Sequence, residues 1–226
     1  MTFTQTLQKY CGSTLFLVGV LLYAAGNVLA VFAIHGVVGI MPLLIFAPVI
    51  AGLLLIFFES KHEKEPKNTL RVLMFFKVCV KIILVIYFIS AIGIIYLFAP
   101  LWGHYFAGLI VIFVFISIPV MILFAFSLRV LNSIRRNLKE NRPVPWTEGK
   151  IKGIVPFCIF GVINAFMELM GMGMFGSITR AIALVFDPRS DFGMNFLVGF
   201  WFGKLISAAG TIILLVILCR LNRELP

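Results

Sequence analysis

Six long stretches of this sequence contain few or no charged residues, and this pattern limits what the chain can fold into. The stretches run approximately over residues 12–34, 37–58, 72–99, 106–128, 154–175 and 196–218. A helix needs about 20 apolar residues to cross the hydrocarbon core of a bilayer. A soluble fold could not cover so much apolar surface, because 62% of the residues are hydrophobic and only 12% are charged. The sequence therefore predicts an all-α integral membrane protein, a single polytopic domain with six transmembrane helices in three hairpins.

The first stretch follows Lys9 and superficially resembles a signal peptide. It is longer than the apolar region of such a peptide, so we expect it to remain as a membrane span.

The basic residues predict the orientation of these spans. The segments 59–71 and 129–153, the inner ends of the spans beside them and the two chain ends hold all but three of the 19 Lys and Arg residues. Arg180 and Arg189 lie in the connection 176–195, and Lys204 lies within a span. Because cytoplasmic loops are enriched in Lys and Arg, we expect loops 59–71 and 129–153 and both termini in the cytoplasm, and loop 176–195 outside. The external loop has room for a short interfacial or re-entrant helix between the last two spans.

The formal net charge of +10 has a membrane explanation rather than a nucleic-acid one. Nucleic-acid binding needs an exposed basic face or groove, whereas these residues lie in short runs between apolar stretches. We therefore expect no nucleic acid as a partner.

A set of residues near the cytoplasmic side is predicted to contact anionic lipids or a protein partner. The fourth helix is expected to continue past the membrane to about Lys139, before the prolines at 143 and 145. Its basic face would rest on anionic lipid, with Trp146 as an anchor. Docking of a cytoplasmic or membrane partner subunit is the alternative. The residues concerned are Lys77, Lys81, Arg135, Arg136, Lys139 and Trp146.

Two charged residues within the last two spans are the most informative feature for function. Glu168 lies about 10 Å and Lys204 about 12 Å from the outer end of its helix, at 1.5 Å per residue. Opposite charges at matching depth on antiparallel helices can meet, and an isolated charge there would cost roughly 3 kcal/mol. We therefore predict an ion pair between Glu168 and Lys204.

The neighbours of this pair predict a polar seam between the last two spans. Asn164 lies one helical turn from Glu168, and Ser207 and Thr211 follow Lys204 at helical spacing. This seam is a candidate substrate, ion or proton site. A structural ion pair that only fixes helix packing is the alternative.

Small residues on the last span predict close helix contact. Gly199, Gly203 and Ser207 recur every four residues, a pattern that permits close approach of two helices in lipid. We favour packing within the chain, and dimerisation to a homo-oligomer is the alternative.

The remaining motifs do not indicate catalysis. The four cysteines lie on four different helices without C-x-x-C spacing, which predicts buried thiols rather than a metal site. There is no H-E-x-x-H or G-x-S-x-G sequence, so no enzyme, metal or cofactor is expected.

These features favour a small transporter, or the permease subunit of a larger transport complex, in a cytoplasmic membrane of bacterial type. A non-catalytic scaffold, regulatory or immunity-type protein that acts through the basic loop is the alternative.

Overall fold

The computed structural model describes residues 2–35, 40–62, 67–102, 106–140, 150–169 and 194–225. Within these ranges every regular element is an α-helix. The helices are α1 (Phe3–Cys11), α2 (Thr14–His35), α3 (Ile40–His62), α4 (Lys67–Trp102), α5 (Phe106–Glu140), α6 (Ile154–Leu169) and α8 (Met194–Glu224). The all-helical prediction is confirmed for this part of the chain.

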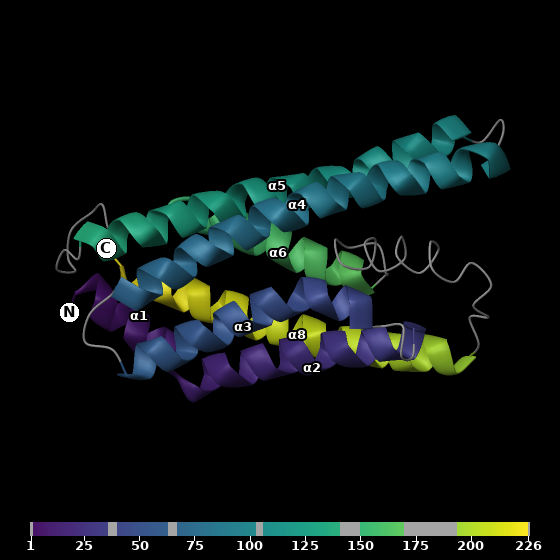
Figure 1. The fold of residues 1–226 in the computed structure, drawn as a ribbon. Coiled ribbons are helices and arrows are strands. Elements are labelled where there is room, and N and C mark those ends of the chain that lie inside the picture. The colour runs from purple at the N-terminus through teal and green to yellow at the C-terminus, as the bar shows by residue number, and fades with distance from the viewer. Residues whose placement is uncertain are drawn as a thin grey trace.

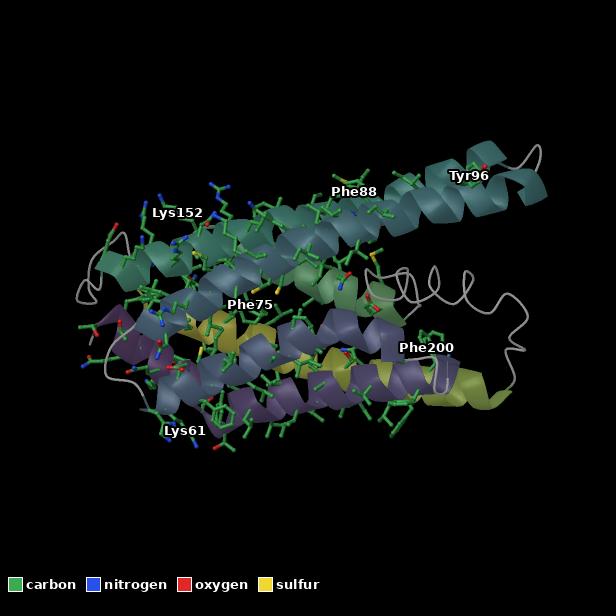
Figure 2. The ribbon with its side chains drawn as sticks, viewed as in Figure 1. Lys61, Phe75, Phe88, Tyr96, Lys152 and Phe200 are labelled. Carbon is green, nitrogen blue, oxygen red and sulfur yellow. The ribbon has the colours of Figure 1, made fainter. Side chains whose placement is uncertain are left out.

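Four of these helices are long and apolar enough to cross a membrane. Their qualifying segments are Thr14–Phe32, Asn68–Ile89, Ser117–Glu140 and Phe200–Glu224, and Ile154–Leu169 is a shorter apolar helix. The surface of the bundle is apolar to match, since Ile89, Ile92 and Tyr96 on α4 are 66%, 65% and 80% exposed. Phe88 and Tyr96 are seen along the α4–α5 pair in Figure 2.

Several helices are longer than the apolar stretches predicted. α3 ends at His62, α4 begins at Lys67, and α5 continues to Glu140. Much of the expected loops 59–71 and 129–153 is therefore helical, and the predicted extension of the fourth helix to about Lys139 is confirmed. The external loop 176–195, apart from the start of α8, lies outside the described residues, as do residues 170–175.

The six helices that the structure describes after α1 form a ring. α2 contacts α3, α3 contacts α4, and the order continues through α5, α6 and α8 back to α2. Figure 1 shows α4 and α5 side by side on one side of the molecule, with α2, α3 and α8 on the other. Both chain ends lie at the same end of the bundle, which we call the terminal end (Figure 1).

Helix α1 closes the ring at the terminal end, and the sequence analysis did not predict it. It contacts α2, α3, α5 and α8. Its N-terminus is capped by Thr2, whose hydroxyl accepts from the Gln5 amide while the Gln5 side chain accepts from the Thr2 amide. This capping box, followed by apolar residues four apart at Phe3, Leu7 and Cys11, is the signal that identifies the helix.

The apolar side of α1 belongs to a buried cluster that explains why α5 and α8 continue so far. The cluster includes Phe3 and Leu7 of α1, Ile134 and Leu138 of α5, and Leu221 of α8. In α5 the buried residues Val130, Ile134 and Leu138 recur every four positions, so the helical extension has an apolar face to bury.

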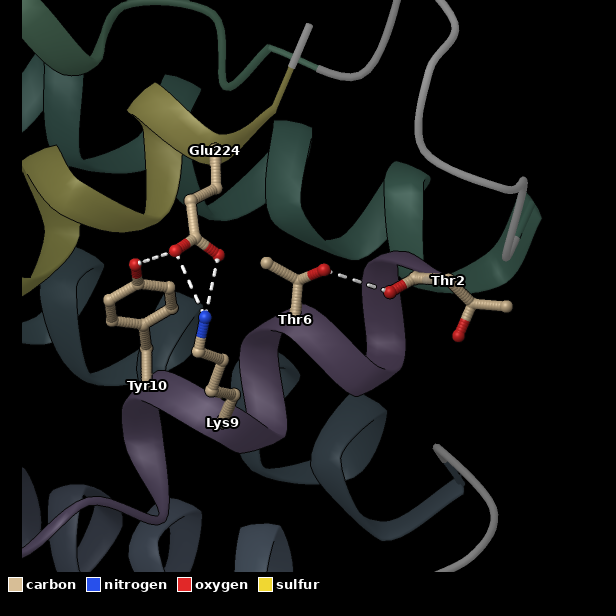
Figure 3. A network of polar contacts seen from close by, with 5 residues as sticks. All are labelled: Thr2, Thr6, Lys9, Tyr10 and Glu224. Atoms are coloured by element: carbon tan, nitrogen blue, oxygen red, sulfur yellow. Dashed lines mark hydrogen bonds and ion pairs between the residues drawn. The ribbon is translucent and has the colours of Figure 1, made fainter.

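The polar side of α1 is joined to the end of α8 (Figure 3). Lys9 Nζ donates to Glu224 Oε1 at 3.0 Å and Oε2 at 3.3 Å, and the Tyr10 hydroxyl also donates to Oε1. The hydrogen bond and the charge of Glu224 raise the pKa of Lys9 above its ordinary value. These contacts tie the two chain ends together.

The cysteines depart in part from the prediction of buried thiols. Cys11 and Cys79 are buried, but Cys158 is only half-buried and Cys219 is exposed. The Sγ atoms of Cys158 on α6 and Cys219 on α8 lie 3.0 Å apart, because these neighbouring helices turn the two side chains toward each other.

Candidate binding site inside the helix ring

The centre of the candidate site is an ion pair between α6 and α8. Lys204 Nζ donates to Glu168 Oε2 at 2.8 Å, and the side chains are only 4% and 12% exposed. The predicted pair is therefore present. The Phe200 ring, one turn before Lys204, lies 5.7 Å from the ammonium, so the cation faces both a carboxylate and an aromatic ring.

A third helix, α2, contributes to the same polar region, which the sequence analysis did not foresee. Asn27 Nδ2 donates to Ser207 Oγ of α8 at 2.9 Å and to the Tyr23 carbonyl one turn earlier. Asn27 is buried, with 2% of its surface exposed. The sequence signal for this contact is Asn27 itself, whose amide lies within an uncharged apolar stretch. A buried polar group in a membrane span needs a partner on another helix.

Glycines explain why α2 and α8 come close enough for that hydrogen bond. A Cβ atom added at Gly26 would lie 2.2 Å from the backbone nitrogen of Ser207. One added at Gly203 would lie 2.5 Å from the nitrogen of Ala30, and one at Gly210 would lie 2.4 Å from that of Tyr23. The predicted packing role within the chain is confirmed for Gly203, whereas the surroundings of Gly199 lie outside the described residues.

The polar residues line a chamber inside the ring, which we call the polar chamber. Its volume is about 210 Å³, and all six helices of the ring contribute to its wall. Asn164, Glu168, Ser207 and Thr211 line it, so their predicted inward orientation is confirmed. Tyr23, Asn27 and Ser127 are lining residues that the sequence analysis did not select.

A larger chamber of about 340 Å³ lies next to it, and we call it the apolar chamber. The two chambers share lining residues from every helix of the ring, among them Tyr23, Val80 and Thr211. The apolar chamber extends to Leu7 and Cys11 of α1 and to Leu221 of α8, so it reaches the terminal end.

The predicted lipid or partner contacts lie elsewhere, on α4 and α5. Lys77 Nζ donates to Asn132 Oδ1 at 3.0 Å, so this lysine joins α4 to α5. Arg136 is exposed and lies 3.7 Å from Glu140 one turn later. Lys81 and Lys139 are exposed and Arg135 is half-buried, whereas Trp146 lies outside the described residues.

The fold and the chambers together define a helical protein with a membrane-type apolar exterior and a partly polar interior. No protein-family model, curated protein or solved structure is significantly similar to the chain.

Proposed function

We propose that the chain crosses a cytoplasmic membrane six times, with the terminal end in the cytoplasm. Lys61 and Lys152 both lie toward this end (Figure 2), close to the chain ends that hold Lys9, Arg220 and Arg223. A cationic end suits the cytoplasmic leaflet, whose lipids are anionic. These residues, with those of the α5 extension, would contact anionic lipid.

We further propose that the protein is a transporter, or the membrane subunit of a larger transport complex, and that the polar chamber binds its substrate. The observation that carries the proposal is a buried ion pair beside the buried Asn27 amide and Ser207 hydroxyl, at a chamber lined by six helices. Charged residues inside spans are costly and mark substrate, ion or proton pathways. Such a chamber serves binding and movement of a ligand rather than bond-breaking chemistry.

The pair gives the chamber a physical means of responding to a ligand. Together, Glu168 and Lys204 satisfy each other at 2.8 Å and carry no net charge. A ligand that hydrogen-bonds to Glu168, or a proton taken up by it, would weaken the pair, which changes how α6 and α8 hold together. Coupling of occupancy to helix arrangement is what alternating access requires.

The test is complementation of a deletion strain, scored by its growth defect, with Glu168→Gln and Lys204→Met. We expect both variants, after correction for their abundance in the membrane, to lose at least about 90% of the complementing activity, a tenfold effect that corresponds to roughly 1.4 kcal/mol. Glu59→Gln and Lys61→Met make the same chemical changes on α3, away from the chamber, and should complement fully. Full activity of both chamber variants would contradict the proposal.

The alternative function is a scaffold, regulatory or immunity-type protein that works through the basic α5 extension. The exposed Arg136 and Lys139 favour it, since they are available to a partner. Such a protein would tolerate the chamber variants and would fail when Arg135, Arg136 and Lys139 are changed to Gln together.

A further inference from the structure

The two chambers lie next to each other and differ in chemical character. Tyr23, Val80 and Thr211 line both, so a ligand that passes these side chains would reach from the polar to the apolar chamber. The volume of the apolar chamber alone, about 340 Å³, lies in the range of sites for small organic molecules, roughly 300–1,000 Å³.

The apolar chamber offers almost nothing to a hydrophilic solute. Its hydroxyl groups come from Tyr23, Thr69, Ser127 and Thr211. Two of them are already donated within their own helices, from Ser127 to the Leu123 carbonyl and from Thr211 to the Ser207 carbonyl. A polar solute that left water for this space would lose hydrogen bonds that the chamber does not replace. A hydrocarbon chain makes no hydrogen bonds in water, so it would lose none on entering.

The polar chamber suits a head group that hydrogen-bonds but carries no charge. Glu168 on its wall is already neutralised by Lys204, so a charged head would find no uncompensated opposite charge there. Asn27, Asn164 and Ser207 lie on the wall. Asn27 Nδ2 already donates to the Tyr23 carbonyl and to Ser207 Oγ, so Asn27 Oδ1 is the acceptor and the Ser207 hydroxyl is the donor that face a head group there. Tyr23 lines both chambers, and its hydroxyl has no hydrogen-bond partner within the described part of the chain.

The shape also sets the direction of the ligand. The apolar chamber ends at α1, where Leu7 and Cys11 line it and the contacts of Lys9 and Tyr10 with Glu224 hold the helix in place. A chain attached to a head in the polar chamber would therefore point toward the terminal end.

We propose that the ligand of this space is a lipid with one apolar chain and an uncharged head that carries hydroxyl or carbonyl groups. The proposal rests on the function proposed above for the polar chamber and names the substrate class. The head lies among Asn27, Asn164 and Ser207, and the chain fills the apolar chamber as far as α1.

The test uses the purified full-length protein in phosphatidylcholine nanodiscs and a monooleoylglycerol whose acyl chain carries a photoreactive diazirine. Irradiation should attach the probe to residues of the apolar chamber such as Leu53, Phe76 and Leu131, and unlabelled monooleoylglycerol should compete. Val80→Phe places a ring at the junction of the chambers and should lower this labelling by about tenfold or more. Val78→Phe makes the same change on the lipid-facing side of α4, where Val78 is 50% exposed, and should have no effect.

Three results would overturn the proposal. The first is labelling confined to outward residues such as Val78 and Val85, and the second is chamber labelling that is insensitive to Val80→Phe in a folded variant. The third is competition by oleate or oleylamine as strong as that by monooleoylglycerol, which would contradict an uncharged head. If Val80→Phe does not fold, the competition of unlabelled monooleoylglycerol, oleate and oleylamine with the probe on the unaltered protein still tests the proposal.

The experiment separates this proposal from the proposed function. If the probe fails while Glu168→Gln and Lys204→Met abolish complementation, the chamber is functional but the lipid class is wrong. If the probe labels the chamber while both variants complement, the ligand assignment stands and the transport role falls.

Discussion

Lys204 and Glu168 illustrate how strongly a single residue constrains a protein in lipid. Each would be costly alone within a span, yet at 2.8 Å they neutralise each other and are nearly excluded from the surface. Asn27 is uncharged but buried, and it also has a partner, since its amide donates to Ser207 across the α2–α8 contact. Buried polar groups here come in partnered sets, and these sets define the polar chamber.

Substitution of the pair should show this dependence in stability. Lys204→Met removes the cation that faces Glu168, and we expect it to destabilise the protein by roughly 3 kcal/mol. Glu168→Gln combined with Lys204→Met removes both charges and should recover most of that loss. Inactivation rates at fixed temperature in detergent measure the effect, because unfolding of membrane proteins is commonly irreversible.

The double variant also distinguishes the two roles of the pair. If it is as stable as the unaltered protein but inactive in complementation, the charges serve function. A double variant that is both stable and active would show that the pair only fixes packing.

At the scale of elements, the contact between α2 and α8 is the closest in the described part of the ring. Its helices approach until the backbone of Ser207 lies beside Gly26 and that of Ala30 beside Gly203. In lipid this closeness comes from small residues, since apolar side chains gain no hydrophobic energy by leaving lipid for each other. Polar partners such as Asn27 and Ser207 can meet only because the backbones are so near.

A methyl group at this contact should therefore be harmful. Gly26→Ala would place its Cβ 2.2 Å from a backbone nitrogen of α8, and we expect a loss of about 1–3 kcal/mol from overpacking. Gly93→Ala on α4 is the matched control, because no atom lies within 4 Å of a Cβ there. Resistance of each variant to thermal inactivation is the measurement, and equal stability of the two variants would contradict the proposed role of Gly26.

At the scale of the whole molecule, the ring has α1 packed against its terminal end and two chambers in its interior. α1 lies across that end, and the apolar chamber stops at its residues. The 36 residues of α4 give it a length of about 54 Å, which exceeds the ~30 Å thickness of a bilayer core. In the proposed membrane orientation, part of α4 therefore projects beyond the hydrocarbon.

The proposed orientation predicts which surface each loop reaches. In a variant whose native cysteines are replaced by serine, Lys61→Cys and Lys152→Cys should react with a membrane-impermeant maleimide only from the cytoplasmic side. Both lysines are exposed and lie at the terminal end (Figure 2). Labelling of the two positions from opposite sides of the membrane would refute the six-span topology.

The sequence by itself determined the helical class, the approximate helices and the pairing of Glu168 with Lys204. These properties follow from local patterns, since apolar runs of sufficient length become helices in lipid and opposite charges at equal depth attract. It also predicted that Gly203 serves close packing, because its spacing from Ser207 is a property of one helix.

Only the tertiary structure decided that α2 lies against α8, that Asn27 completes the polar region, and that two chambers lie next to each other inside the ring. Neighbours in the ring depend on how the surfaces of all the helices fit, and α2 and α8 are distant in sequence. The position of α1 also depends on the tertiary structure. This short amphipathic helix lies at the end of the apolar chamber because α5 and α8 extend far enough to bury its apolar face.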